Sequence, residues 1–293
     1  MFDTPINFFK SVFAYNFFVE PADRNYYLAR FCRMHKMHEE FWSQALQAVE
    51  KYLKASIICN GGSAKAEKGD NGHDIVKLWE KHKIALGEDA VVELQKPERL
   101  AEDWWRNDQL KSFIQRINRM GNPDSRYGMA SYSNHEDDFF KLDELVFQLR
   151  RTTIGMDWIV GADWDAEEDL IEYYGKTYRE ALRGKSRSQI RPIRMPTGRF
   201  ERIGEEAADV WQAWNFSFTR DAQDINKPYP SSLTSTPTAR NSEIFQLTEA
   251  LKTATIDEGV RERINWLTES IHLHKGTMAE LTRIMQTKPK KQK

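Results

Sequence analysis

Helical periodicity is the feature that most constrains the fold of this chain. Between the glycines and prolines, apolar residues recur at steps of three and four, and no run alternates strictly between apolar and polar residues. The clearest segment covers residues 39–59 and ends at Asn60, Gly61 and Gly62, because glycine readily adopts the conformation that terminates a helix. Its apolar stripe consists of Trp42, Leu46, Val49, Leu53 and Ile57. The pattern predicts an all-α protein.

Further amphipathic segments in the first half predict the partners of this helix. They cover residues 21–38, 74–83, 108–120 and 139–152, each with apolar residues at helical spacing. Consecutive helices of this length pack side by side, with neighbours antiparallel. We therefore expect an antiparallel helical bundle over residues 23–160, preceded by an aromatic N-terminal segment over residues 1–22.

The second half, residues 161–293, predicts a helical C-terminal region with two loops and a long last helix. Residues 183–200 contain six basic and no acidic side chains, and their prolines indicate a basic loop. Residues 226–240 contain three prolines and many Ser and Thr residues, which indicates an extended loop. Over residues 257–286, apolar residues alternate steps of four and three, the period of a coiled coil. This seam predicts one long helix that pairs two copies of the chain or packs on its own domain.

Charge and composition limit the class of protein. The chain has 293 residues, of which 43 are basic and 44 acidic, so its net charge of −1 attracts neither nucleic acid nor anionic lipid as a whole. The longest apolar runs fall far short of the about 20 residues of a membrane span. Two cysteines are too few for a disulfide framework. We expect a soluble cytoplasmic protein that needs no metal and no cofactor.

Three sequence elements of the first half match a known family. They are Gln47–Ala55 in the second predicted helix, Gly72–Leu78 at the start of the third, and Ser125–Tyr127 after the fourth. In this order and spacing they resemble the HEPN family (higher eukaryote and prokaryote nucleotide-binding domain) over residues 23–152. The resemblance implies a bundle of four or five helices, commonly dimeric, with a groove that binds nucleotides or RNA in some members. It therefore implies a nucleotide or RNA ligand and a homodimer.

The resemblance also implies a biological setting. Many HEPN members accompany nucleotidyltransferase domains or belong to toxin–antitoxin and antiviral systems. We therefore expect a defence-system protein that has a nucleotidyltransferase or an antitoxin as a possible partner.

Four residues of the matching elements are candidates for binding phosphate: Lys51, Lys54, His73 and Arg126. His73 lies near a predicted helix N-terminus, where backbone N–H groups favour anions. Glu50 and Lys54 are four residues apart in the order that favours a surface ion pair, so a solvated helix face is the alternative for this stretch.

A catalytic branch of the HEPN family consists of metal-independent ribonucleases with an Arg, four to six intervening residues and a His. Imidazole serves as an acid or base, and guanidinium stabilises the charge that develops on phosphorus. Arg126 and His135 have eight residues between them, and the required spacing occurs only in Arg30 with His35 and Arg33 with His38. We expect binding without efficient catalysis, with a ribonuclease effector using these pairs as the alternative. A structural protein that dimerises through its C-terminal helix is a third interpretation.

The basic loop is a candidate nucleic-acid patch. Arginine suits phosphate because its planar fork donates two hydrogen bonds to one group. The alternative is that these side chains neutralise the acidic run over residues 163–169 of the same chain. The candidates are Arg183, Lys185, Arg187, Arg191, Arg194 and Arg199.

Overall fold

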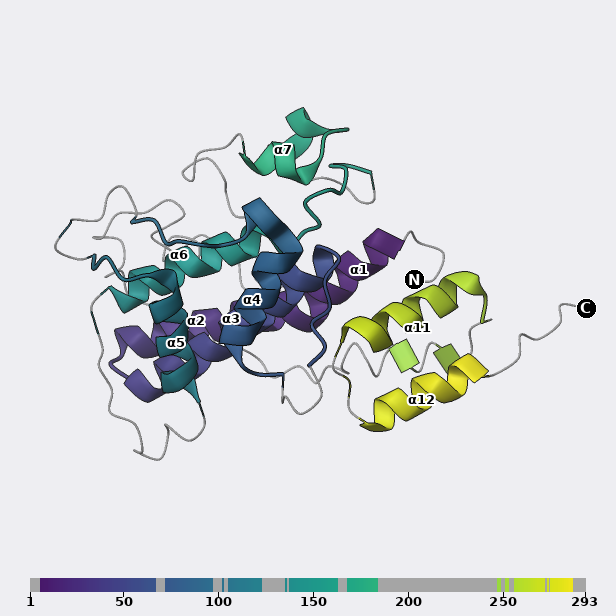
Figure 1. Ribbon diagram of the computed structural model, residues 1–293, viewed down its shortest axis with the longest axis horizontal. Helices are drawn as coiled ribbons and strands as arrows, with labels where there is room; N and C mark the ends of the chain where they lie inside the picture. The colour runs from purple at the N-terminus through teal and green to yellow at the C-terminus, as the bar shows by residue number, and fades with distance from the viewer. Residues whose placement is uncertain are drawn as a thin grey trace, which may run out of the picture.

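The described part of the chain is built from helices (Figure 1). The computed structural model describes residues 6–66, 72–96, 102, 105–122, 135, 137–162, 168–183, 247–248, 251–252, 256–271, 273 and 275–286. Within these ranges there is no strand, only one isolated bridge between Ile159 and Thr177. The prediction of an all-α protein is confirmed for these residues. The α-helices are α1 (Ile6–Ala14), α2 (Glu20–Met34), α3 (His38–Cys59), α4 (Ile75–Leu86), α5 (Leu110–Gly121), α6 (Asp138–Arg151), α7 (Tyr178–Arg183), α11 (Glu258–Ser270) and α12 (Lys275–Gln286).

Helix α3 lies at the centre and packs against α1, α2, α4, α5 and α6. Of its predicted stripe, Leu46 is partly exposed and the other four side chains are buried. At its contact with α5, a Cβ on Gly121 would lie 2.4 Å from Leu46 Cβ and 2.6 Å from the Trp42 carbonyl oxygen. Glycine at the end of α5 therefore allows the two backbones to approach closely.

The N-terminal aromatic residues belong to the same core. Helix α1 continues through a π-helical segment, η1 (Tyr15–Val19), directly into α2. Phe9, Phe13 and Phe18 are buried in one cluster with the residues of α3. Because a π-helical segment departs from the 3.6-residue period, regular spacing does not reveal this helix in the sequence. The helical region thus begins at Ile6, inside the segment that we expected to precede the bundle.

Two buried ion pairs join α2 to α6. Asp23 of α2 accepts hydrogen bonds from Arg150 of α6 at 3.1 and 3.2 Å, and it also accepts one from the hydroxyl of Tyr52 on α3. Seven residues further along α2, Arg30 donates to Asp143 of α6 at 2.5 Å. All four charged residues are at most 3% exposed. Because the later residue of α2 pairs with the earlier residue of α6, the two helices run antiparallel at this contact.

The prediction of one long helix over residues 257–286 is wrong for the described residues. Helix α11 ends at Ser270, Ile271 has an extended backbone, and α12 begins at Lys275. The carbonyl oxygens of Glu269 and Ser270 accept hydrogen bonds from Ser63 and Ala64, which follow α3. In a continuous helix these carbonyls would accept from backbone N–H groups four residues later. The connection after α3 therefore ends α11.

Helices α11 and α12 instead pack against each other, and α11 also contacts α1 (Figure 1). Arg261 donates to the Met285 carbonyl oxygen at 3.0 Å across this contact. Most of the described residues of the predicted seam are buried within the chain and so are not available for a coiled coil between copies; His274 lies outside the described residues, and Met278 and Met285 are partly buried. The buried members of the seam are Val260, Ile264, Leu267, Ile271 and Leu281.

Candidate functional site

Three of the four predicted phosphate-binding residues lie close together. The Lys54 ammonium donates to Glu50 Oε1 at 2.7 Å, and His73 Nδ1 lies 2.9 Å from the same oxygen. Lys51 is their neighbour on α3, and its pKa is affected by the charges of both Glu50 and Lys54. The Glu50 and Lys54 side chains are only 13% and 11% exposed, whereas His73 is 66% exposed. The ion pair predicted from the sequence is present, but it is more buried than a solvated helix face.

Lys51 occupies a different environment from Lys54. Its ammonium donates to the amide oxygens of Asn25 on α2 and of Gln47, the latter at 3.4 Å. Burial lowers the pKa of Lys51, Glu50 offsets part of this effect, and the charge of Lys54 adds to it. Lys51 is therefore held between α2 and α3 by neutral amide groups.

The N-terminus of α4 is already capped. Asp74 accepts a hydrogen bond from the backbone N–H of Val76 at 3.0 Å, and Asn118 of α5 accepts one from Ile75 at 3.3 Å. Because these donors are occupied, the helix N-terminus adds little for an anion beside His73. The fourth candidate, Arg126, lies outside the described residues.

Of the two Arg–His pairs with the required spacing, Arg33 and His38 are in contact, whereas Arg30 and His35 have other partners. Arg33 Nη1 lies 3.2 Å from His38 Nδ1, and Arg33 Nη2 donates to the His135 carbonyl oxygen at 2.8 Å. Arg30 is buried and bonded to Asp143, whereas His35 is exposed, with its ring centroid 4.2 Å from that of Phe31. Arg33 and His38 could therefore act together, whereas Arg30 forms part of the ion-pair contact between α2 and α6.

The nucleic-acid patch predicted over residues 183–200 falls almost entirely outside the described residues. Helix α7 ends at Arg183, and only the backbone of this residue is described. Lys185, Arg187, Arg191, Arg194 and Arg199 lie in the part that is not described.

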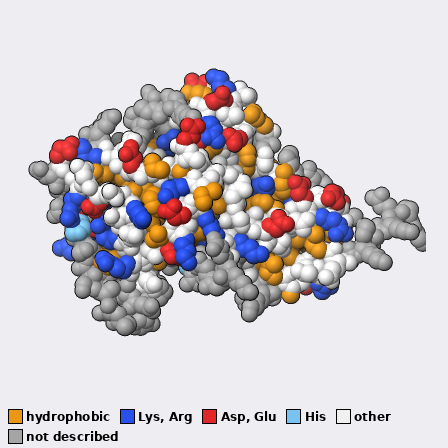
Figure 2. Space-filling view, in the orientation of Figure 1, with side chains coloured by type: hydrophobic (Ala, Val, Ile, Leu, Met, Phe, Trp, Pro, Cys, Tyr) orange, Lys and Arg blue, Asp and Glu red, His pale blue; other side chains and the backbone are white. Residues whose placement is uncertain are grey.

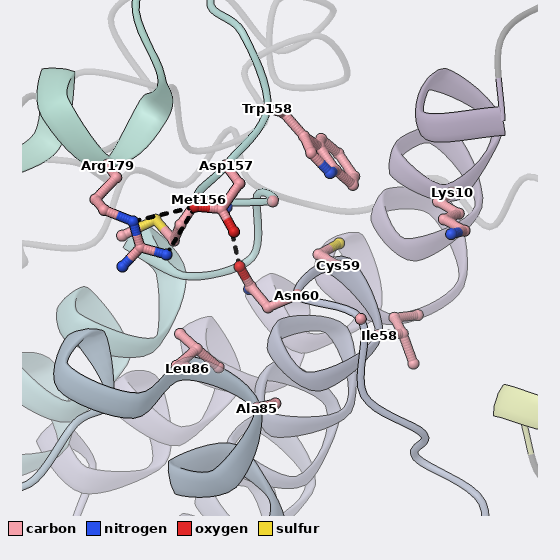
Figure 3. Close-up of a pocket in the computed structure, with 12 residues that line it drawn as sticks. Lys10, Ile58, Cys59, Asn60, Ala85, Leu86, Met156, Asp157, Trp158 and Arg179 are labelled. Atoms are coloured by element: carbon pink, nitrogen blue, oxygen red, sulfur yellow. Dashed lines mark hydrogen bonds and ion pairs between the residues drawn. The ribbon is translucent and has the colours of Figure 1, made fainter.

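One cavity of about 220 Å³ was not anticipated from the sequence (Figure 3). It lies between α1, the C-terminal ends of α3 and α4, and residues 155–158. Arg179 on its wall is paired with Asp157 at 2.9 Å and with Asp89. Burial raises the pKa of the Cys59 thiol to about 12. The cavity is smaller than most ligand pockets, and its arginine is already neutralised by two carboxylates. No motif joins these residues, so the sequence carried no signal for it.

A cluster of ion pairs links the start of α6 to α5 and to Asp108, which precedes α5. The buried Lys141 ammonium contacts Asp137 at 2.7 Å and Asp108 at 3.0 Å, and Arg116 contacts Asp138 at 2.6 Å. Opposite charges compensate each other here. Among the described residues, no group of His, Cys, Asp and Glu side chains is suited to hold a metal ion.

The surface does not separate into large charged regions on the face that Figure 2 shows. Basic and acidic side chains are interspersed there among apolar ones. None of the described helices has both the length and the apolar character required to cross a lipid bilayer.

Comparisons of the chain with protein-family models, with curated proteins and with solved structures find no match. The arrangement of the described side chains is therefore the basis for the function proposed below.

Proposed function

We propose that this chain is a HEPN-like helical bundle that binds nucleotide or RNA phosphate without efficient catalysis. The observation that carries the proposal is that Lys54 and His73 both contact Glu50, while Lys51 lies near enough for the charge of Glu50 to act on it. These residues come from two of the sequence elements that resemble the HEPN family. Two ammonium groups and an imidazole beside one carboxylate leave a net positive charge, which favours an anionic ligand.

Equilibrium binding tests the proposal. Fluorescence anisotropy of labelled RNA, with ATP and GTP as competitors, is measured at two salt concentrations. We expect binding that weakens as salt rises, because phosphate contacts release counterions. Lys51→Met removes the half-buried ammonium and weakens binding, whereas Lys111→Met removes an exposed charge from α5 and serves as the matched control. If no ligand binds below millimolar concentration even at low salt, the proposal fails.

A ribonuclease is the second candidate function, and the contact between Arg33 and His38 favours it. A guanidinium 3.2 Å from an imidazole nitrogen places a phosphate-binding group beside a general acid or base. The test is cleavage of labelled RNA in the presence of EDTA. We expect His38→Ala to abolish cleavage, with His35→Ala as the control because His35 is exposed and packs on Phe31. Cleavage that survives His38→Ala excludes this pair.

We also propose that the chain forms a homodimer, because HEPN-like bundles are commonly dimeric. Light scattering of the purified chain measures its mass in solution, and a monomer across the accessible concentration range contradicts this part. An antitoxin or a nucleotidyltransferase remains the proposed class of partner.

A further inference from the structure

Amide and ammonium groups line the contact between α2 and α3. We call Gln44, Gln47 and Lys51 of α3, together with Asn25 of α2, the donor strip. The steps of three and four place the three α3 side chains on one side of the helix. Each of them is partly exposed. At 1.5 Å per residue, the strip extends for about 10 Å along α3.

The hydrogen bonds within the donor strip use its acceptors. Asn25 donates to Gln44 Oε1 at 2.6 Å and to Gln47 Oε1 at 3.5 Å, and Lys51 donates to the oxygens of Asn25 and Gln47. Within the described part of the chain, the side-chain nitrogens of Gln44 and Gln47 donate to no protein atom. Each of these nitrogens carries two N–H donors. The strip therefore has N–H donors available for a ligand, whereas its amide oxygens accept hydrogen bonds from within the strip.

The single charge of the strip, on Lys51, is only partly offset by the neighbouring Glu50. Lys51 is held by amide oxygens, and its described contacts include no carboxylate. Lys54, one turn further along α3, is paired with Glu50 and so compensates that carboxylate. One ammonium and the amide N–H groups of Gln44 and Gln47 thus form a row of donors that matches phosphate oxygens. Phosphates are the same in every nucleotide, so donors that contact them carry no information about the bases.

We propose that the donor strip contacts consecutive phosphates of single-stranded RNA and does not select among bases. This inference rests on the proposed function and specifies its ligand as an extended backbone. A nucleoside triphosphate joins its phosphorus atoms through single bridging oxygens, so it is too compact to use all three α3 side chains at once. The phosphates of single-stranded RNA are further apart than those of a nucleoside triphosphate, so consecutive phosphates can contact successive side chains of the strip.

Binding of short homopolymers to the full chain tests base selection. We expect RNA octamers of U, A and C to bind within about threefold of one another, as in sequence-tolerant recognition of single strands. ATP should compete at least about tenfold less well than an octamer, because fewer charges are engaged. A difference of more than about tenfold among the octamers, or ATP binding as tightly as they do, overturns the inference while leaving the proposed function intact.

Variants of Gln47 test the donors themselves. Gln47→Glu retains an oxygen for Lys51 and Asn25 but replaces the free donor with a second oxygen, so we expect about tenfold weaker octamer binding. Gln47→Met removes the donor without adding charge, and we expect about a threefold to tenfold loss. Gln115→Glu on the exposed side of α5 is the control for added charge. Circular dichroism confirms that each variant folds.

The outcomes separate the two proposals. If both Gln47 variants bind octamers as the wild type does, the inference fails and the phosphate site lies elsewhere. If the wild type binds neither octamers nor nucleotides, the proposed function fails, and this inference fails with it.

Discussion

The stability of this protein should fall in mild acid because of one buried histidine. His82 of α4 is 0% exposed, and its Nε2 accepts a hydrogen bond from the backbone N–H of Val91 at 3.0 Å. The proton is therefore assigned to Nδ1, which donates to Ser56 Oγ at 3.0 Å, and Ser56 donates to Thr152 at 2.7 Å. Burial lowers the pKa of His82 from 6.5 to about 4. A protonated ring would lose the bond from Val91 and carry a charge in the core.

The size of the effect follows from this pKa. Between about pH 6.5 and pH 4, the unfolded chain binds a proton at His82 that the folded chain does not bind, so acidification favours unfolding. At about 1.4 kcal/mol per pKa unit, the free energy of unfolding decreases by about 2 kcal/mol at pH 5 and by about 3 kcal/mol at pH 4. Above about pH 6.5, His82 is neutral in both the folded and the unfolded chain, so it no longer lowers the free energy of unfolding.

Urea unfolding followed by circular dichroism measures the effect at about pH 7.5 and about pH 5. His82→Gln retains one donor and one acceptor but does not titrate, so the wild type should lose about 2 kcal/mol more than this variant. His35→Gln, at an exposed position, is the control and should follow the wild type. Equal losses in the wild type and His82→Gln would refute the reasoning.

Three further changes follow from the packing. Asp23→Ala removes the carboxylate that neutralises the buried Arg150, so urea titration should show a loss of about 3–5 kcal/mol, part of which is recovered when Arg150→Met is added. Gly121→Ala brings a methyl group against the Trp42 carbonyl oxygen and should cost about 1–3 kcal/mol, measured in the same way. Because its pKa is about 12, Cys59 should react with iodoacetamide in the native chain far more slowly than in urea, as peptide mapping by mass spectrometry will show.

The central helices could be predicted from the sequence because their apolar residues face one core. The stripe of residues 39–59 and the stop at Asn60–Gly62 correspond to α3 and its end at Cys59. The N-terminal helix was missed because η1 interrupts the regular period. The division between α11 and α12 depends on hydrogen bonds from Ser63 and Ala64, which lie about 200 residues away in the chain. Periodicity within one segment carries no signal for such a contact.

The candidate site was only partly predictable for a similar reason. Helical spacing places Lys51 and Lys54 on one side of α3, and it pairs Lys54 with Glu50. The contributions of His73 and Asn25 depend on how α2 and the start of α4 pack against α3, which no local pattern specifies. Likewise, Arg30 matched a catalytic spacing in sequence, yet its partner Asp143 is on another helix.

The two buried ion pairs between α2 and α6 also discriminate against misalignment. Asp23 and Arg30 are seven residues apart on one helix, and Asp143 and Arg150 are seven apart on the other. Sliding α6 by seven residues in one direction would oppose Asp23 with Asp143, and sliding it in the other would oppose Arg30 with Arg150. Either shift places two like charges together away from water, which is strongly unfavourable. A collapsed chain in which α2 and α6 are shifted by seven residues is therefore much less stable than the native alignment.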